Sequence, residues 1–438
     1  MQPTADASRD PTLISLPLTL NAEKSTAESS SLSDLNYIPD GGLRAWLQVV
    51  GGFGLILNSW GIFNAYGAFQ TFYEQNVLRA NSASSIAWIG SIQGCLLLFT
   101  SFFAGPIFDM GCARPLIYTG SVLITFGMMM TSLCTKFYQV LLAQGIVVGL
   151  GGGCIFVPSV AIIATYFKTR RAFASGVALT GSSIGGVIYT AAFRQLSAQI
   201  GFPWATRVVA FIAFGVFLVS LALLRPRPVR KGSSRRHLID KSAWTELPYV
   251  LFVAGMTLGF MSAYIPYFYI NTFAAARTGA SADVAFYFVA VLNAASTVGR
   301  TLPNFIADRT GPLNILVPSV LVSGTLGLAW IAVRGIGALS IWAVLFGFFS
   351  GTFVSLPPAS VASLTEDLTR VGTRMGMAFT FMGVGLLVGN PIAGALINLE
   401  TGNFLRAQIF CGVLVLASGL VLAAARVAKV GWALRAKA

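Results

Sequence analysis

The composition of this 438-residue chain is typical of a protein that resides in a lipid bilayer. Hydrophobic residues make up 55% of it and charged residues 10%, whereas soluble globular proteins carry about 25% charged residues. So few charges could not cover the surface of a soluble protein of this length. The net charge of +14 is explained by the Lys and Arg that membrane proteins keep in cytoplasmic loops, so we expect no nucleic-acid partner.

Apolar stretches of the length needed to cross a bilayer, about 20 residues, follow a polar amino-terminal segment. Residues 1–38 are rich in Ser, Thr, Ala and Asp without helical periodicity, which predicts a disordered cytosolic tail. The first six predicted spans cover about 46–70, 84–106, 115–135, 138–162, 174–198 and 204–224. The second six cover about 248–274, 284–306, 313–333, 337–361, 375–398 and 405–425. We therefore predict an all-α membrane protein with twelve transmembrane helices.

A basic segment that contains Pro and Ser separates the two sets of spans. We predict an amino-terminal half at 39–224, a cytosolic linker at 225–247, a carboxy-terminal half at 248–425 and a cytosolic tail at 426–438. With the amino terminus inside, cytoplasmic segments hold most of the 29 Lys and Arg residues, so both termini are expected in the cytosol. We expect the plasma membrane as the location, with a vacuolar or other internal membrane as the alternative.

Glycine, proline and aspartate recur at matching places in the two sets. Asp109 follows span 2, and Asp308 follows span 8. Matching residues in spans 4 and 10 are Gly149, Gly153 and Pro158, and Gly347, Gly351 and Pro357. Two sets of six spans, interrupted by Gly and Pro at matching places, are typical of secondary transporters. The alternative role of each glycine is tight helix packing.

Three stretches resemble known transporter motifs. The Gly-x-x-x-Asp loop after span 2 resembles the loop motif of the major facilitator superfamily. Residues 39–46 (Pro-Asp-Gly-Gly-Leu-Arg-Ala-Trp) and 166–176 (Tyr-Phe-Lys-Thr-Arg-Arg-Ala-Phe-Ala-Ser-Gly) are similar to the two signatures of the monocarboxylate transporter (porter) family, in its fungal, riboflavin-transporter-like branch. The resemblance implies the major facilitator fold, with two pseudo-symmetric six-helix halves and alternating access.

Charged residues in and beside these motifs are candidates for conformational gating. Carboxylates that bond to helix amino termini or to arginines could latch one conformation and release it when the halves rock. The candidates are Asp40, Asp109, Arg114, Arg170, Arg171, Asp308 and Arg309. The alternative is that these charges only fix the topology of the loops.

One arginine within a predicted span is the candidate for anion binding. The resemblance implies that animal members bind a carboxylate and a proton with a Lys in span 1 and with an Asp four residues before an Arg in span 8. The corresponding residues here are Asn64, Ser296 and Arg300, so two of the three groups are missing. An arginine inside the membrane is costly and is by default functional. We expect Arg300 to bind an anion or to act in gating, unless it snorkels to the cytoplasmic surface.

Uncharged polar side chains within the spans are candidates for the substrate pathway. Buried amides need partners and therefore face the interior of the bundle. With Arg300, the candidates are Asn64, Tyr66, Gln93, Tyr189, Tyr264, Asn293 and Asn390. Hydrogen bonding between helices is the alternative role for each. Together with 33 Phe and 8 Trp, they suggest an organic anion or a partly aromatic solute as cargo.

Acidic residues are absent from the middle of every predicted span, and the only histidine, His237, lies in the linker. A proton relay normally needs a titratable group inside the bundle. We therefore hypothesise facilitated transport, or coupling to protons through a peripheral group.

The expected function is secondary transport of a small organic solute, with export of a secondary metabolite from a fungal biosynthetic gene cluster as the main interpretation. Uptake of a carboxylate or of a vitamin such as riboflavin by facilitated diffusion is the alternative, and a non-transporting nutrient sensor is the remote one. We expect no enzyme, cofactor or metal, because no His, Asp or Cys cluster converges. The five cysteines form no CxxC pair. The lipid bilayer is the other expected partner, an accessory subunit stays an open question, and no glycoprotein is expected.

Overall fold

A computed structural model describes residues 40–227, 239–365, 370–398 and 401–433. The predicted disordered tail at 1–38 and the middle of the predicted linker lie outside these described residues. Within them the chain is helical, and the one β contact is an isolated bridge between Asn398 and Asn403.

The helices before the linker belong to the first half of the chain. They are α2 (Leu43–Asn64), α3 (Tyr66–Phe72), η1 (Tyr73–Val77), α4 (Ala83–Asp109), α5 (Ala113–Thr131), α6 (Phe137–Val140), η2 (Leu141–Val148), α7 (Gly149–Ala164) and α8 (Arg171–Leu223). Both η1 and η2 are π-helical, with a wider turn than an α-helix.

The helices from the end of the linker onward belong to the second half of the chain. They are η3 (Lys241–Thr245), α9 (Leu247–Ser262), α10 (Ile265–Arg277), α11 (Ala282–Phe286), α12 (Phe288–Thr310), α13 (Pro312–Ala329), η4 (Trp330–Ala332), α14 (Ile336–Ser355), α15 (Pro357–Leu364), α16 (Val371–Leu396) and α17 (Leu405–Val430). Here η3 and η4 are short 3₁₀ turns.

Nine helical runs in the described part of the chain are long and apolar enough to cross a membrane. The difference from the predicted twelve has identifiable sources. Helix α8 counts once, although its 53 residues cover predicted spans 5 and 6 and break at Gly201, whose φ of 77° suits glycine. Helices α5 and α12 coincide with predicted spans 3 and 8 but are less apolar, and α12 carries Arg300, Asp308 and Arg309.

Two helices are longer than hydrophobicity predicts. The first run continues through α3 and η1 to Val77, seven residues beyond predicted span 1. Helix α17 continues to Val430, so the predicted tail at 426–438 begins as helix. Polar residues at these ends complete helical turns without adding to the apolar window.

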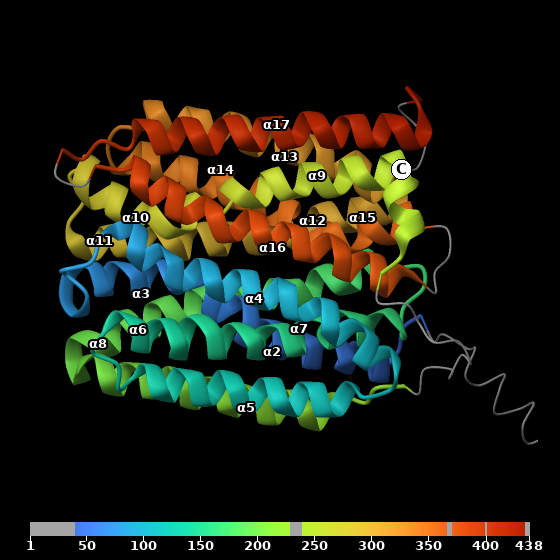
Figure 1. Cartoon of the computed structure of the whole chain (residues 1–438), viewed down its shortest axis with the longest axis horizontal. Coiled ribbons are helices and arrows are strands. Elements are labelled where there is room, and N and C mark those ends of the chain that lie inside the picture. Colours follow the sequence, from blue (N-terminus) through green and yellow to red (C-terminus); the bar gives the residue numbers. More distant parts are fainter. Residues whose placement is uncertain (1–39, 228–238, 366–369, 399–400, 434–438) are drawn as a thin grey trace, which may run out of the picture. The chain divides into compact units, whose positions relative to one another are not determined.

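Corresponding helices pack alike in the two halves of the chain. Helix α4 packs on α7, and α12 packs on α14; α5 packs on α8, and α13 packs on α17. The halves meet through α4 against α16, α8 against α12, and α3 against α10, and Figure 1 shows the long helices side by side. Within each half, glycines permit the helices to pack closely. A Cβ added to Gly149 of α7 would lie 2.9 Å from the carbonyl oxygen of Gln93 in α4, and a Cβ added to Gly347 of α14 would collide with the carbonyl oxygen of Leu292 in α12.

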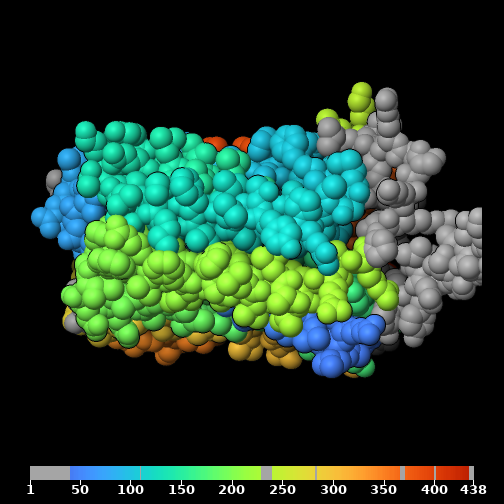
Figure 2. All heavy atoms as spheres, turned by 90° about the horizontal axis from the view of Figure 1, so that it is seen from below, coloured from blue at the N-terminus to red at the C-terminus, as the bar shows by residue number. Residues whose placement is uncertain are grey.

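One face of the helices is strongly apolar. Figure 2 shows α5 beside the second part of α8. Exposed large apolar side chains of these two segments include Tyr118, Val122, Phe126, Phe211, Phe214 and Leu218. A patch of this kind is rare on soluble monomers and is suited to contact with lipid.

Candidate functional site

A cavity of about 370 Å³ lies between the two halves of the chain. Helices α4, α7 and α8 line it from the first half, and α12, α13, α14, α15 and α16 line it from the second. Its lining is mostly apolar, and its charged members are Arg171 and Asp308. We call this side of the molecule the linker end, because Asp40, Arg171, Asp240 and Asp308 lie at the helix ends there.

A second, smaller cavity of about 20 Å³ contains the predicted anion-binding residue. It shares Phe156, Pro358 and Phe379 with the larger cavity, so these three residues separate the two spaces. Trp60 and Arg300 also line it. The larger cavity therefore leads toward Arg300 through an apolar constriction.

Arg300 is buried without an acidic partner. Its side chain lies in the middle of α12 and the residue is 3% exposed. Nε donates to Ser296 Oγ at 3.2 Å, and Ser296 Oγ also accepts from Ser183 Oγ of α8 at 3.2 Å. No Asp or Glu of the described residues forms an ion pair with Arg300. A buried, uncompensated guanidinium is unfavourable unless an anion reaches it.

Aromatic rings from both halves surround this arginine pocket. Trp60 of α2 stacks on Tyr264 with 6.1 Å between ring centroids, and Phe156 of α7 lies 5.6 Å from Phe379 of α16. The phenols of Tyr264 and Tyr267 lie close enough to interact with the charge of Arg300. The pocket thus combines a cation with ring faces, which suits an anion that carries an aromatic group.

The end of the molecule opposite the linker end is packed shut between the halves. A Cβ on Gly67 of α3 would collide with the Tyr267 carbonyl oxygen of α10. Tyr66 and Phe268 rings lie 5.1 Å apart, and Ser84 Oγ of α4 donates to the Pro391 carbonyl of α16 at 3.0 Å. The structure therefore has a cavity toward the linker end and close helix contact at the opposite end.

Asp308 connects the two halves at the mouth of the larger cavity. Its two carboxylate oxygens accept from the backbone N–H groups of Ala172, at 3.1 Å, and Phe173, at 3.0 Å. These groups belong to the first turn of α8, where N–H groups have no partner within the helix. Asp308 of α12 thus caps the amino terminus of a helix from the other half.

Asp40 joins the two stretches that resemble family signatures. Its carboxylate accepts from the backbone N–H groups of Lys168, at 2.7 Å, and Thr169, at 2.9 Å, and from Thr169 Oγ at 2.5 Å. Its own N–H donates to the Tyr166 carbonyl at 3.0 Å. The Thr169 hydroxyl, followed by the Lys168 N–H, lowers the pKa of Asp40. This contact lies within the first half.

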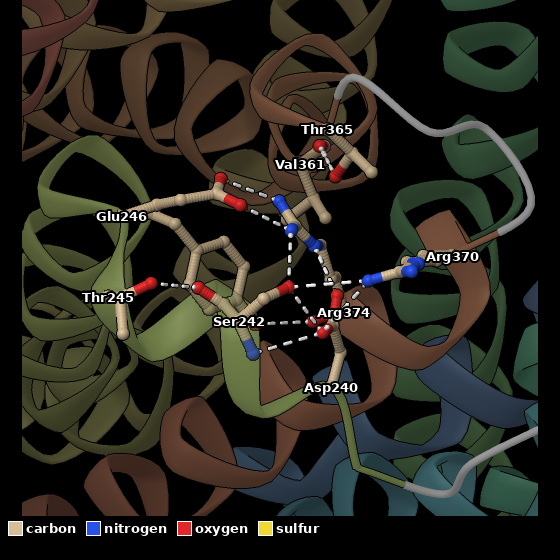
Figure 3. Close-up of polar contacts among 9 residues, drawn as sticks. Asp240, Ser242, Thr245, Glu246, Val361, Thr365, Arg370 and Arg374 are labelled. Carbon is tan, nitrogen blue, oxygen red and sulfur yellow. Dashed lines mark hydrogen bonds and ion pairs between the residues drawn. The ribbon is translucent and has the colours of Figure 1, made fainter.

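An ion cluster at the end of the linker was not predicted (Figure 3). Arg374 of α16 donates from Nε to Asp240 at 2.9 Å and from both terminal nitrogens to Glu246, at 2.7 and 2.5 Å. Arg370 lies 3.4 Å from Asp240. Burial alone would raise the pKa of Asp240, but hydrogen bonds from Ser242 and Arg374 outweigh it and lower that pKa. Sequence analysis singled out none of these residues, because nothing in the sequence pairs α16 with the linker.

The other predicted pathway residues are buried but do not line the two cavities. Several bond between helices: Tyr189 to Asn58 at 2.5 Å, Asn64 to the Ser182 carbonyl at 3.2 Å, and Tyr66 to the Ile86 carbonyl at 2.6 Å. Asn293 donates within α12 to the Val289 carbonyl. The side-chain amides of two further residues have no hydrogen-bond partner in the described part, namely Gln93 and Asn390.

The remaining predicted gating residues lie at the linker end. Arg114 and Arg170 are exposed. Arg309 is also exposed and stacks on Phe305 at 4.8 Å. Asp109 ends α4, and its side chain lies outside what the structure describes. In the described residues no group of three His, Cys, Asp or Glu side chains could hold a metal ion.

Paired helical halves, a cavity between them and a buried cation are typical of a membrane transporter. Residues 51–342 match the Major Facilitator Superfamily. The chain is 46% identical, over 87% of its length and 86% of the relative's, to the MFS-type transporter dbaD of Emericella nidulans. It is 38% identical to the aspyridones efflux protein apdF of the same organism, over 87% of this chain and 78% of that protein. The chain therefore belongs to the major facilitator superfamily.

Solved structures support the fold. The human organic anion transporter MFSD10 matches with a TM-score of 0.67 at 13% identity, over 87% of this chain and all of that one. The Escherichia coli fucose:proton symporter FucP matches with a TM-score of 0.62 at 15% identity, over 87% of this chain and 98% of that one. The prediction of a multi-pass membrane transporter rather than an enzyme is confirmed.

Proposed function

We propose that this protein exports a small organic anion with an aromatic part, made by a secondary-metabolite gene cluster. The observation that carries the proposal is Arg300, which is buried among aromatic rings between the halves without an acidic partner. A cargo anion would supply the missing negative charge, and Trp60 and Phe379 offer ring faces to its apolar part. The name of the relative apdF, an efflux protein for aspyridones, supports the direction of transport.

The proposed topology has twelve crossings in two six-helix halves, with both termini and the linker in the cytosol. The break at Gly201 divides α8 into two crossings, and the matched packing of the halves supports the division. In this orientation the larger cavity faces the cytosol and the opposite end is shut. That is the state in which an exporter takes up cargo from the cell, and the plasma membrane is the proposed location.

The proposed subfamily is the monocarboxylate porter family, in its fungal, riboflavin-transporter-like branch. The hydrogen bonds from Asp40 to Lys168 and Thr169 support it, because they join the two stretches that resemble the family signatures. Ser296 replaces an acidic partner of Arg300 in that family, so the arginine charge is left for the cargo. This difference favours a cargo other than the simplest monocarboxylates.

The test is a comparison of metabolites in a producing strain with and without the gene. We expect at least one acidic, aromatic compound to fall in the medium and to rise in the cells after deletion, as measured by untargeted mass spectrometry. Restoring the gene should reverse both changes. Unchanged levels of every such compound in medium and cells would contradict export.

A further inference from the structure

The nine candidate membrane spans contain a single acidic residue, Glu74. It lies in η1, the π-helical turn that continues the first span beyond α3. Its side chain is partly buried at the packed end of the molecule, opposite the linker end. Single π-helical turns within a helix often occur at functional sites because they change which way side chains point. The transport site described above does not use this carboxyl group.

The partner of Glu74 is the side-chain amide of Gln70, whose oxygen receives no hydrogen bond. Gln70 is 1% exposed, and its Nε2 donates to Glu74 Oε1 at 3.0 Å. The other atom of the amide, Oε1, is buried without any hydrogen-bond partner. An ionised carboxylate can only accept, whereas a protonated carboxyl group can also donate. Protonation of Glu74 would therefore supply an O–H donor for the unpaired side-chain oxygen of Gln70.

No cation compensates Glu74 in the described residues. The ionisable groups that interact with it are the phenols of Tyr66, on its own helical run, and Tyr269 of α10, and Tyr73 is its neighbour in sequence. Tyr66, Tyr73 and Tyr269 donate their protons to the Ile86 carbonyl, Gln144 Oε1 and the Asn390 carbonyl, respectively. Neither α4 nor η2 contains a Lys or Arg, and both Arg79, which follows η1, and Arg277, at the end of α10, are exposed. A negative charge here has only the Gln70 amide to stabilise it.

The pair lies where the two halves touch. Gln70 is next to Tyr269 of α10, and α3 packs on α10 one turn away, at Gly67. We propose that Glu74 and Gln70 form a proton-binding site of this gate: protonation favours the packed end observed here, and opening hydrates the carboxyl group and releases the proton. The gating role rests on the proposed alternating access. Glu74 is thus the peripheral proton carrier that the sequence analysis left open.

Infrared spectroscopy of the full-length protein in nanodiscs tests proton binding without any cargo. We expect a carboxylic-acid C=O band that disappears as the pH is raised, that is lost in Glu74→Gln, and that is kept in the matched control Glu246→Gln. A band of unchanged amplitude in Glu74→Gln, or no titrating band at all, would overturn the proposal. Loss of the band does not depend on transport, so this result is independent of the proposed export.

Gate opening is measured in the same preparation. With the five native cysteines replaced, a cysteine introduced at Ser84 reports access to the packed contact with Pro391. It is labelled with a water-soluble maleimide, and because only the thiolate reacts, each rate is divided by that of a free thiol at the same pH. We expect this relative rate to rise with pH in the otherwise unchanged protein, and Glu74→Gln to hold it at its low, acidic value at every pH. The same pH dependence with and without Glu74 would refute its role in the gate.

Discussion

Two buried arginines of this protein have opposite surroundings. Arg374 donates to two carboxylates and its side chain is 6% exposed, whereas Arg300 donates to one hydroxyl group of Ser296. A guanidinium that is already paired fixes structure, and one that is unpaired is available to a ligand. Its place inside an apolar span, together with the family resemblance, was enough to select Arg300. The partners of Arg374 lie 128 and 134 residues away in the chain, so no local pattern predicts them.

Replacing Arg374 by Met should destabilise the protein, because it removes the buried and closer of the two cations beside Asp240 and leaves only the more exposed Arg370. We expect a loss of about 3 kcal/mol, the lower end for breaking a buried pair, since Glu246 is partly exposed. The lowered pKa of Asp240 means that its stabilisation is complete above the ordinary pKa, about 4, and is lost as the pH falls through the lower, folded value. Thermal unfolding of the detergent-solubilised protein measures both effects. An unfolding temperature unchanged by Arg374→Met would contradict the structural role of the cluster.

At the scale of the helices, the sequence predicts most of the elements and few of their contacts. Helices occupy all the predicted apolar ranges. The reason is that a segment of about twenty apolar residues in lipid must satisfy its backbone hydrogen bonds internally, and an α-helix does so. The π-helical turns η1 and η2 and the continuation to Val77 carry no composition signal, so the partly buried position of Glu74 was not predicted. Glycine spacing indicated close packing, but which helix each glycine meets depends on the tertiary arrangement.

Gly389 of α16 should be intolerant of alanine. An added Cβ would overlap the Met261 carbonyl oxygen of α9, and overpacking of this kind costs about 1–3 kcal/mol. Gly389→Ala should therefore lower the thermal unfolding temperature of the purified protein. The matched control is Gly215→Ala in α8, where an added Cβ meets nothing within 4 Å and improves helix propensity. Equal effects of the two substitutions would show that α9 and α16 are not in close contact.

At the scale of the whole molecule, the two halves meet differently at the two ends. The linker end has a cavity and the cap from Asp308 to α8, and the opposite end has close contact between α3 and α10. The repeated loop aspartates predicted a gating role for Asp308. They did not predict that its partner would be a helix amino terminus, because that contact needs α8 and α12 to be adjacent.

Replacing Asp308 by Asn should loosen the linker end, since an amide caps a helix without a negative charge. The negative charge at a helix amino terminus is worth about 0.3–1 kcal/mol, or roughly 2- to 5-fold in a conformational equilibrium. We expect a cysteine introduced at Ala359, in the cavity lining, to react faster with a maleimide by a factor in this range. Asp308→Glu, which keeps the charge, is the control. A slower or unchanged reaction in Asp308→Asn would argue against a latch.

The central claim is that Arg300 binds the anionic part of an exported cargo. The most direct measurement compares the medium of a gene-deleted producing strain that carries wild-type protein, Arg300→Ala, Arg300→Lys or Arg334→Ala, an exposed control. Loss of a charge-assisted contact of about 1.5–3 kcal/mol predicts a roughly 10- to 100-fold fall in export of an acidic metabolite for Arg300→Ala at equal protein levels. Export by Arg300→Lys should lie between that of the wild type and that of Arg300→Ala, and export by Arg334→Ala should equal that of the wild type. Wild-type export of an anionic metabolite by Arg300→Ala would contradict the claim.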